Sequence, residues 1–65
     1  MMALDAEQNA ALKRLRAMVK DEGVKTIAEW TVLHRSTLMT VLADTAREST
    51  IVYALDRFMK AEKKG

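Results

Sequence analysis

The fold of this chain is decided by residues 27–42, which read Ile-Ala-Glu-Trp-Thr-Val-Leu-His-Arg-Ser-Thr-Leu-Met-Thr-Val-Leu. Apolar or small side chains recur in this stretch at Ile27, Ala28, Thr31, Leu33, Leu38 and Val41. Their spacing predicts two short helices folded against each other across a tight corner at residues 32–34. The second helix opens with Arg-Ser-Thr, which would project hydrogen-bond donors outward and suits reading DNA in the major groove. Packing within a small bundle is the alternative that periodicity alone allows.

A longer helix is expected before this stretch, from about residue 6 to residue 21. Asp5 can cap it, and Gln8 stands three residues later, as a capping box requires. Gly23 is well placed to end the helix in a left-handed conformation. The first helix of the pair would then start at Val24 or Lys25 and end near Thr31.

The last part of the chain predicts a fourth helix. The helix that opens with Arg-Ser-Thr, the third along the chain, would run from Arg35 to about residue 43. Residues 44–48 would form a polar loop after it. Ser49 or Thr50 can cap a helix that continues to about residue 62, with residues 60–65 forming a charged tail that frays. The apolar residues of this helix cover more than one narrow stripe, which is more than a single core requires; they are Ile51, Val52, Ala54, Leu55, Phe58 and Met59.

Composition favours helix throughout and one small domain over residues 1–65. The sequence has no proline, two glycines and no cysteine, so neither a disulfide framework nor a cysteine metal site is available. We therefore expect an all-α, compact bundle of about four helices. A chain of this size buries only about 60% of its unfolded surface, which favours self-association. Without a long apolar run or a secretion signal, we expect no membrane contact and a cytoplasmic location.

The charge pattern is more informative than the net charge of +2. No acidic residue occurs between Trp30 and Ala43, whereas His34 and Arg35 stand near the corner. A surface without carboxylates avoids repelling phosphate. The pattern therefore favours a nucleic-acid partner, although a gap of this length in the acidic residues also arises by chance.

The stretch "IAEWTVLHRSTLMTVL" resembles the helix-turn-helix of bacterial and phage regulators in the Cro and lambda-repressor class. Residues 23–59 are also similar to the short antidote-type regulators of toxin–antitoxin modules. The segment "STIVYALDRF" resembles small phage repressors, including those associated with anti-CRISPR operons. The resemblance covers about two thirds of the chain and implies a DNA-binding regulator carried by a phage or another mobile element.

The resemblance implies that Arg35, Ser36 and Thr40 face the base edges, with Met39 beside the groove. Arg35 is the strongest candidate because a guanidinium can bond bidentately to guanine O6 and N7; an ordinary solvated arginine is its alternative. Met39 would contact a thymine methyl or else cover part of the core. Thr37 would cap the helix or contact phosphate.

Phosphate contacts are expected on both sides of this helix. Lys25 and Thr26 lie at a helix start, where free N–H groups and the helix dipole favour an anion. Arg47, Ser49 and Thr50 precede the last helix and would contact the backbone of the DNA in the same way. His34 would contact phosphate or nothing.

Val32 departs from the family pattern, which usually has glycine at the corner. A β-branched residue with positive φ there would cost on the order of 1–2 kcal/mol. We therefore expect either a corner that has adjusted to negative φ or a different crossing of the two helices.

Ile51, Tyr53 and Phe58 are predicted to form a dimer interface, because the apolar surface of the last helix is broad and tyrosine tolerates half-wet surroundings. The alternative for Phe58 is the core, with Trp30 partly covering it. No metal site, cofactor or enzymatic activity is expected.

These predictions describe a sequence-specific transcriptional repressor of its own operon, which binds an inverted repeat in double-stranded DNA as a homodimer. The alternative is an antitoxin or inhibitor whose main role is to bind a partner protein, such as a toxin.

Overall fold

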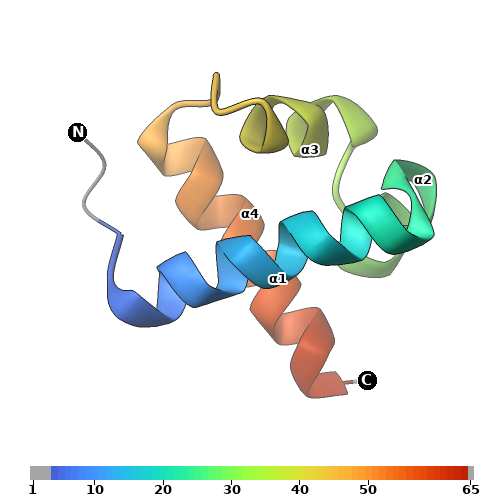
Figure 1. The fold of residues 1–65 in the computed structure, drawn as a ribbon, viewed down its shortest axis with the longest axis horizontal. Helices are drawn as coiled ribbons and strands as arrows, with labels where there is room; N and C mark the ends of the chain where they lie inside the picture. The colour runs from blue at the N-terminus through green and yellow to red at the C-terminus, as the bar shows by residue number, and fades with distance from the viewer. Residues whose placement is uncertain (1–3, 65) are drawn as a thin grey trace.

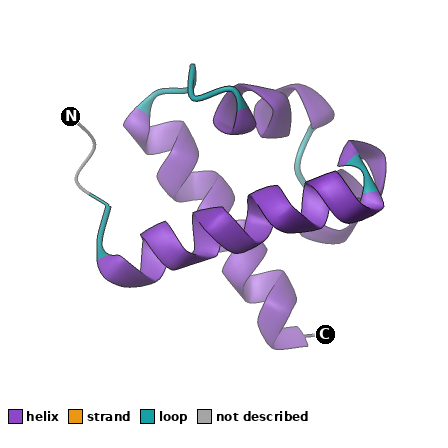
Figure 2. Cartoon of the chain, viewed as in Figure 1, coloured by secondary structure: helices purple, strands orange, loops and turns teal. Residues whose placement is uncertain are grey.

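A computed structural model describes residues 4–64, which contain four helices and no strand (Figures 1 and 2). Their bounds are Ala6–Glu22 for α1, Val24–Thr31 for α2, Arg35–Leu42 for α3 and Glu48–Lys64 for α4. The expected all-α bundle of about four helices is therefore confirmed. None of these helices combines the length and the apolar character that a bilayer span requires.

The start of α1 is fixed by local hydrogen bonds, as the sequence predicts. The backbone N–H of Gln8 donates to Oδ1 of Asp5 at 2.7 Å, and the N–H of Asp5 donates to Oε1 of Gln8 at 3.0 Å. Together these contacts form a complete capping box. Asp5 and Gln8 thus satisfy two donors that a helix start otherwise leaves without partners.

Gly23 alone separates α1 from α2, and its conformation differs from the one predicted. Its φ of 94° is positive, but its ψ of 152° places it outside the left-handed helical region. This extended region with positive φ is accessible essentially only to glycine. Gly23 adopts this conformation because it both ends α1 and begins α2. Its N–H donates to the carbonyl of Val19 at 2.8 Å.

Helix α4 packs against each of the other three helices and supplies much of the core. Figure 1 shows it crossing α1, with α3 beside its first half. Ile51 and Phe58 are 1% and 0% exposed within the single chain. The prediction that these two residues form a dimer interface is therefore wrong, because the core already encloses them. Tyr53 remains accessible at 53% exposed.

The alternative for Phe58 is the one that the structure shows. Trp30 is half-buried and meets Phe58 edge-to-face, with ring centroids 5.7 Å apart and planes at 80°. This arrangement is the one that aromatic quadrupoles favour. Trp30 therefore helps to hold α2 against α4.

Both ends of α4 extend beyond the predicted limits. The helix begins at Glu48, so Ser49 and Thr50 lie in its first turn and do not precede it as caps. At the other end, residues 60–64 are helical, which corrects the prediction that they fray; Gly65 lies outside the described residues. Ala61 is buried, and the guanidinium of Arg14 on α1 holds Glu62 through two bonds of 2.9 Å. These tertiary contacts explain why the charged tail stays helical.

Candidate nucleic-acid interface

Helix α3 is anchored by one face and leaves the other open. Leu38 and Val41 are 0% and 1% exposed and belong to the core. The four residues predicted to contact bases are all exposed: Arg35 lies in the first turn, and Ser36, Met39 and Thr40 lie on the face opposite Leu38 and Val41. Met39 is 59% exposed, so the alternative in which it covers the core is wrong. The core packing thus fixes which face of α3 is available to a ligand.

The corner between α2 and α3 retains a left-handed residue despite Val32. Its φ and ψ are 58° and 43°, so the first of the two expected alternatives, a corner adjusted to negative φ, is wrong. The conformation turns the chain sharply, and the N–H of the next residue, Leu33, bonds to the carbonyl of Ala28 at 3.0 Å. Leu33 is 8% exposed and plugs the space beneath the corner, whereas the side chain of Val32 is 69% exposed.

Arg57 on α4 supports this corner, a role that the sequence did not predict. Its Nε donates to the carbonyl of Thr31 at 3.4 Å, and its Nη2 donates to that of Val32 at 3.5 Å. The carbonyls that end a helix lack intrahelical partners and carry partial negative charge, which a cation complements. The only signal in the sequence was a cation among the apolar residues of the last helix.

Lys25, His34 and Arg35 line one shallow depression of about 240 Å³ between the starts of α2 and α3. Three residues predicted separately to contact DNA thus lie on one surface. Glu29 also lines this depression, one residue before the stretch without acidic residues begins at Trp30. The carboxylate of Glu29 opposes an approaching phosphate and partly offsets the two cations.

The N-terminus of α3 is left without a side-chain cap. His34 precedes it in extended conformation, with φ −66° and ψ 143°, and its side chain makes no capping hydrogen bond. Thr37 is half-buried, and the capping role suggested for it is not observed. The N–H groups in the first turn of α3 therefore remain available to bind an anion.

Thr40 is already engaged within α3. Its hydroxyl donates to the carbonyl of Thr37 at 2.8 Å. In this arrangement the Thr40 oxygen can still accept a hydrogen bond, so as a base contact it would recognise a donor such as an exocyclic amine.

The remaining predicted phosphate contacts do not gather at one place. Thr26 is exposed on the first turn of α2 and Arg47 directly before α4, at the far end of α3. Thr50 is half-buried, and Ser49 lines a different surface together with Val52 and Tyr53. Among the candidates near the start of α4, Arg47 is therefore the one best placed to contact a phosphate.

The chain matches no protein-family model, no curated protein and no solved structure.

Proposed function

We propose that this chain is a sequence-specific DNA-binding repressor in which α2, the corner and α3 form a helix-turn-helix. The observation that carries the proposal is the exposed face of α3, where Arg35, Ser36, Met39 and Thr40 project while Leu38 and Val41 hold the helix in the core. A helix anchored in this way can enter the major groove as a rigid body, with its first turn at the base edges.

Charge on the surrounding surface supports the same proposal. Lys25 and His34 adjoin Arg35 in one depression, and Arg47 lies beyond the other end of α3. Phosphate contacts at both ends would set the register of α3 in the groove, because such contacts position a protein without reading sequence. No acidic residue occurs within α3 itself.

As a homodimer, the protein would place two α3 helices about one DNA turn apart, roughly 34 Å, on an inverted repeat. It would repress its own operon by occupying promoter DNA, in the cytoplasm of a bacterium or of a phage-infected cell.

Selection from randomised DNA duplexes tests the function directly. The purified chain is incubated with the pool, bound duplexes are sequenced, and the affinity for the enriched site is measured by fluorescence anisotropy at about 50 and about 200 mM salt. We expect an enriched inverted repeat and an affinity that falls steeply with salt, because phosphate neutralisation releases counterions. Recovery of duplexes with no shared sequence would contradict specific recognition.

A second candidate function, an antitoxin or inhibitor that binds a partner protein, has one observation in its favour. Val52 and Tyr53 are exposed side by side on α4 and line a groove that does not involve α3. Co-expression with the product of the neighbouring gene, followed by size-exclusion chromatography, tests this candidate. A stable 1:1 complex whose formation abolishes the partner's activity would favour it over repression alone.

A further inference from the structure

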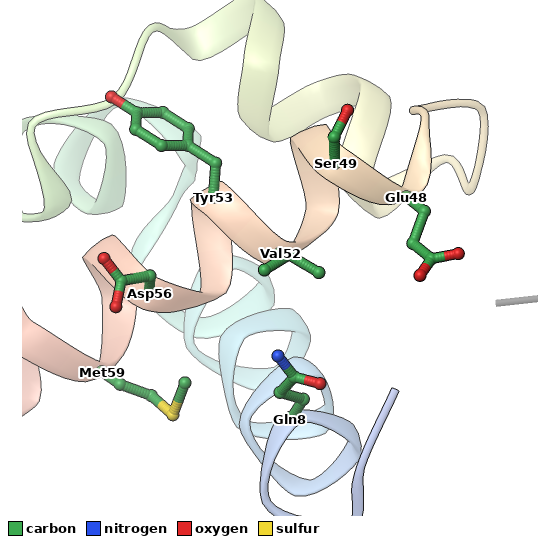
Figure 3. A pocket seen from close by; sticks show the side chains of 7 residues that line it. All are labelled: Gln8, Glu48, Ser49, Val52, Tyr53, Asp56 and Met59. Carbon is green, nitrogen blue, oxygen red and sulfur yellow. The ribbon is translucent and has the colours of Figure 1, made fainter. Parts of the chain in front are cut away.

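A groove of about 680 Å³ lies between α4 and the start of α1, and among the described residues its lining comes from those two helices. Figure 3 shows Gln8 approaching from α1, while the other side chains line up along α4. The apolar part of the lining consists of Val52, Tyr53 and Met59. Val52 and Tyr53 are 36% and 53% exposed, so residues 4–64 leave this surface uncovered.

Charges are distributed unevenly along this face of α4. Glu48 stands at the start of the groove, whereas Lys60 and Lys63 follow the apolar side chains toward the end of the helix. Met59 and Lys63 both line a second depression next to this groove, which shows that the two side chains lie close together. Apart from the carboxylate of Asp56 near its middle, the face is acidic, then apolar and then basic from one end to the other.

We propose that this face of α4 seats a second copy of the chain, with the two α4 helices packed antiparallel. The proposal rests on the homodimer proposed above and names its surface. A two-fold axis brings the same patch of each protomer together, so an antiparallel arrangement places Glu48 of each chain near Lys63 of the other. A parallel arrangement would instead place like charges against each other at both ends of the face.

Asp56 lies near the middle of the face and would approach its counterpart across the two-fold axis. Its carboxylate already pairs with Lys60 at 3.1 Å on the same helix. This pair leaves little net charge at the centre, where the apolar side chains of the two chains would meet. The ends of the face therefore determine the orientation, and the centre supplies apolar burial.

The size of this face indicates a weak dimer. A standard interface buries about 800 Å² on each partner, a large share of the 4550 Å² surface of this chain. In the part of the chain that the structure describes, three apolar side chains lie along the face, so we expect a dissociation constant on the order of micromolar. Pairing on adjacent half-sites would raise the local concentration and strengthen the contact.

Sedimentation velocity of two charge-reversal variants, E48K and K63E, tests the antiparallel pairing. Each variant alone brings like charges together, so each should sediment as a monomer at concentrations where the native chain is dimeric. An equimolar mixture should restore the dimer, because the lysine introduced by E48K in one chain then meets the glutamate introduced by K63E in the other. Circular dichroism verifies that both variants, which change exposed side chains, remain folded.

Two further variants complete the design. The substitution Tyr53→Asp should prevent association both alone and in the mixture, because it introduces a charge into the apolar centre. The substitution Lys20→Glu reverses a charge on α1, away from this face, and should leave the dimer intact. A native chain that stays monomeric at millimolar concentration, or a mixture of E48K and K63E that stays monomeric, would overturn the proposal.

This experiment uses no DNA, so its outcome is separate from that of the proposed function. If E48K is monomeric yet still binds a single half-site, both proposals stand. If the native chain forms the antiparallel dimer but binds no specific DNA, the interface stands and the repressor function does not.

Discussion

Arg57 donates through Nη2 to the carbonyl oxygen of Val32 at 3.5 Å, across 25 positions of sequence. Nε of the same guanidinium reaches the carbonyl of Thr31 at 3.4 Å. The strained corner between α2 and α3 is therefore supported by a side chain from α4. This relationship connects the face of α3 that we propose to contact DNA with the central helix of the bundle.

The substitution Val32→Gly should stabilise the chain by about 0.5–1 kcal/mol. Removing the Cβ atom relieves on the order of 1–2 kcal/mol of strain in the left-handed backbone. Glycine also gives the unfolded chain more conformational freedom, which offsets about 0.5–1 kcal/mol of this gain. Little burial is lost, because Val32 is 69% exposed. Urea denaturation followed by circular dichroism measures the difference. Val32→Ala retains Cβ and serves as the control; an equal gain from Val32→Ala would show that strain is not the cause.

The substitution Arg57→Ala should destabilise the chain by about 0.5–1 kcal/mol, the lower part of the usual net range for a hydrogen bond, because both contacts of Arg57 are long. Arg57→Lys should recover part of the loss, since it retains the charge near the end of α2 but lacks the planar fork. Hydrogen exchange should accelerate at the N–H of Leu33, which closes the corner. Lys64 and Arg57 line one depression beside the corner. Lys64→Ala removes another cation from it and should leave exchange at Leu33 unchanged; equal acceleration in both variants would argue against a specific role for Arg57.

The substitution Gly23→Ala should destabilise the chain by about 1–3 kcal/mol through backbone strain alone. A Cβ added at Gly23 would meet no atom within 4 Å, so no steric clash contributes. Chemical synthesis with D-alanine at position 23 provides the control, because a D-residue favours positive φ. We expect thermal unfolding of the D-alanine chain at or above the native midpoint; a loss as large as that of Gly23→Ala would point to a cause other than chirality.

Acid should weaken the contact between α1 and α4. The hydrogen bonds from the Arg14 guanidinium lower the pKa of Glu62 below its usual 4.5. Because the pKa of Glu62 is lowered in the folded chain, its ion pair with Arg14 stabilises the fold fully at pH values above the usual pKa. This stabilisation disappears as the pH falls through the lowered pKa. The substitution Glu62→Gln should therefore lower the melting temperature at neutral pH, and the difference from the native chain should vanish in strong acid, below the lowered pKa.

The substitution Arg14→Gln provides the control for this pair. In that background Glu62 has lost its partner, so Glu62→Gln should change the melting temperature little at any pH. A pH-dependent difference that persists without Arg14 would assign the effect to other neighbours of Glu62.

On the proposed DNA site, Arg35→Ala should cost about 1–3 kcal/mol of binding free energy and relax the preference at one base pair. Lys25→Ala should weaken binding to all sequences alike and reduce the salt dependence, because it removes a phosphate contact. Fluorescence anisotropy on the selected site and on single-base variants measures both effects. If Arg35→Ala retains both affinity and base preference, α3 does not read the DNA through its first turn.

Local signals predicted the helices well. The capping box of Asp5 and Gln8 is made by residues three positions apart, so its hydrogen bonds follow from sequence alone. The positive φ of Gly23 was predicted for the same reason, but its ψ was not, since it depends on the immediate start of α2. Arg35 and Ser36 are exposed, as the resemblance implied, whereas the sequence left Met39 open between the groove and the core.

Predictions that depended on distant partners were less successful. Ile51 and Phe58 were assigned to a dimer interface because α4 carries more apolar residues than one stripe requires. The periodicity of α4 could not show that three other helices surround it and enclose both side chains. The grouping of Lys25 with His34 and Arg35, with Glu29 among them, likewise required the crossing of α2 and α3.

The sequence by itself determined the number of helices, the cap of α1 and the polar face of α3, because each depends on residues within one or two turns. Only the tertiary structure decided the left-handed Val32, the continuous helix to Lys64 and the division of α4 into a core face and an exposed face. Arg57 and Glu62 reach partners 25 and 48 positions away, and such contacts exist only once the helices have packed. The free energy of those contacts, absent from any short window of sequence, offsets local preferences for a different turn and a frayed end.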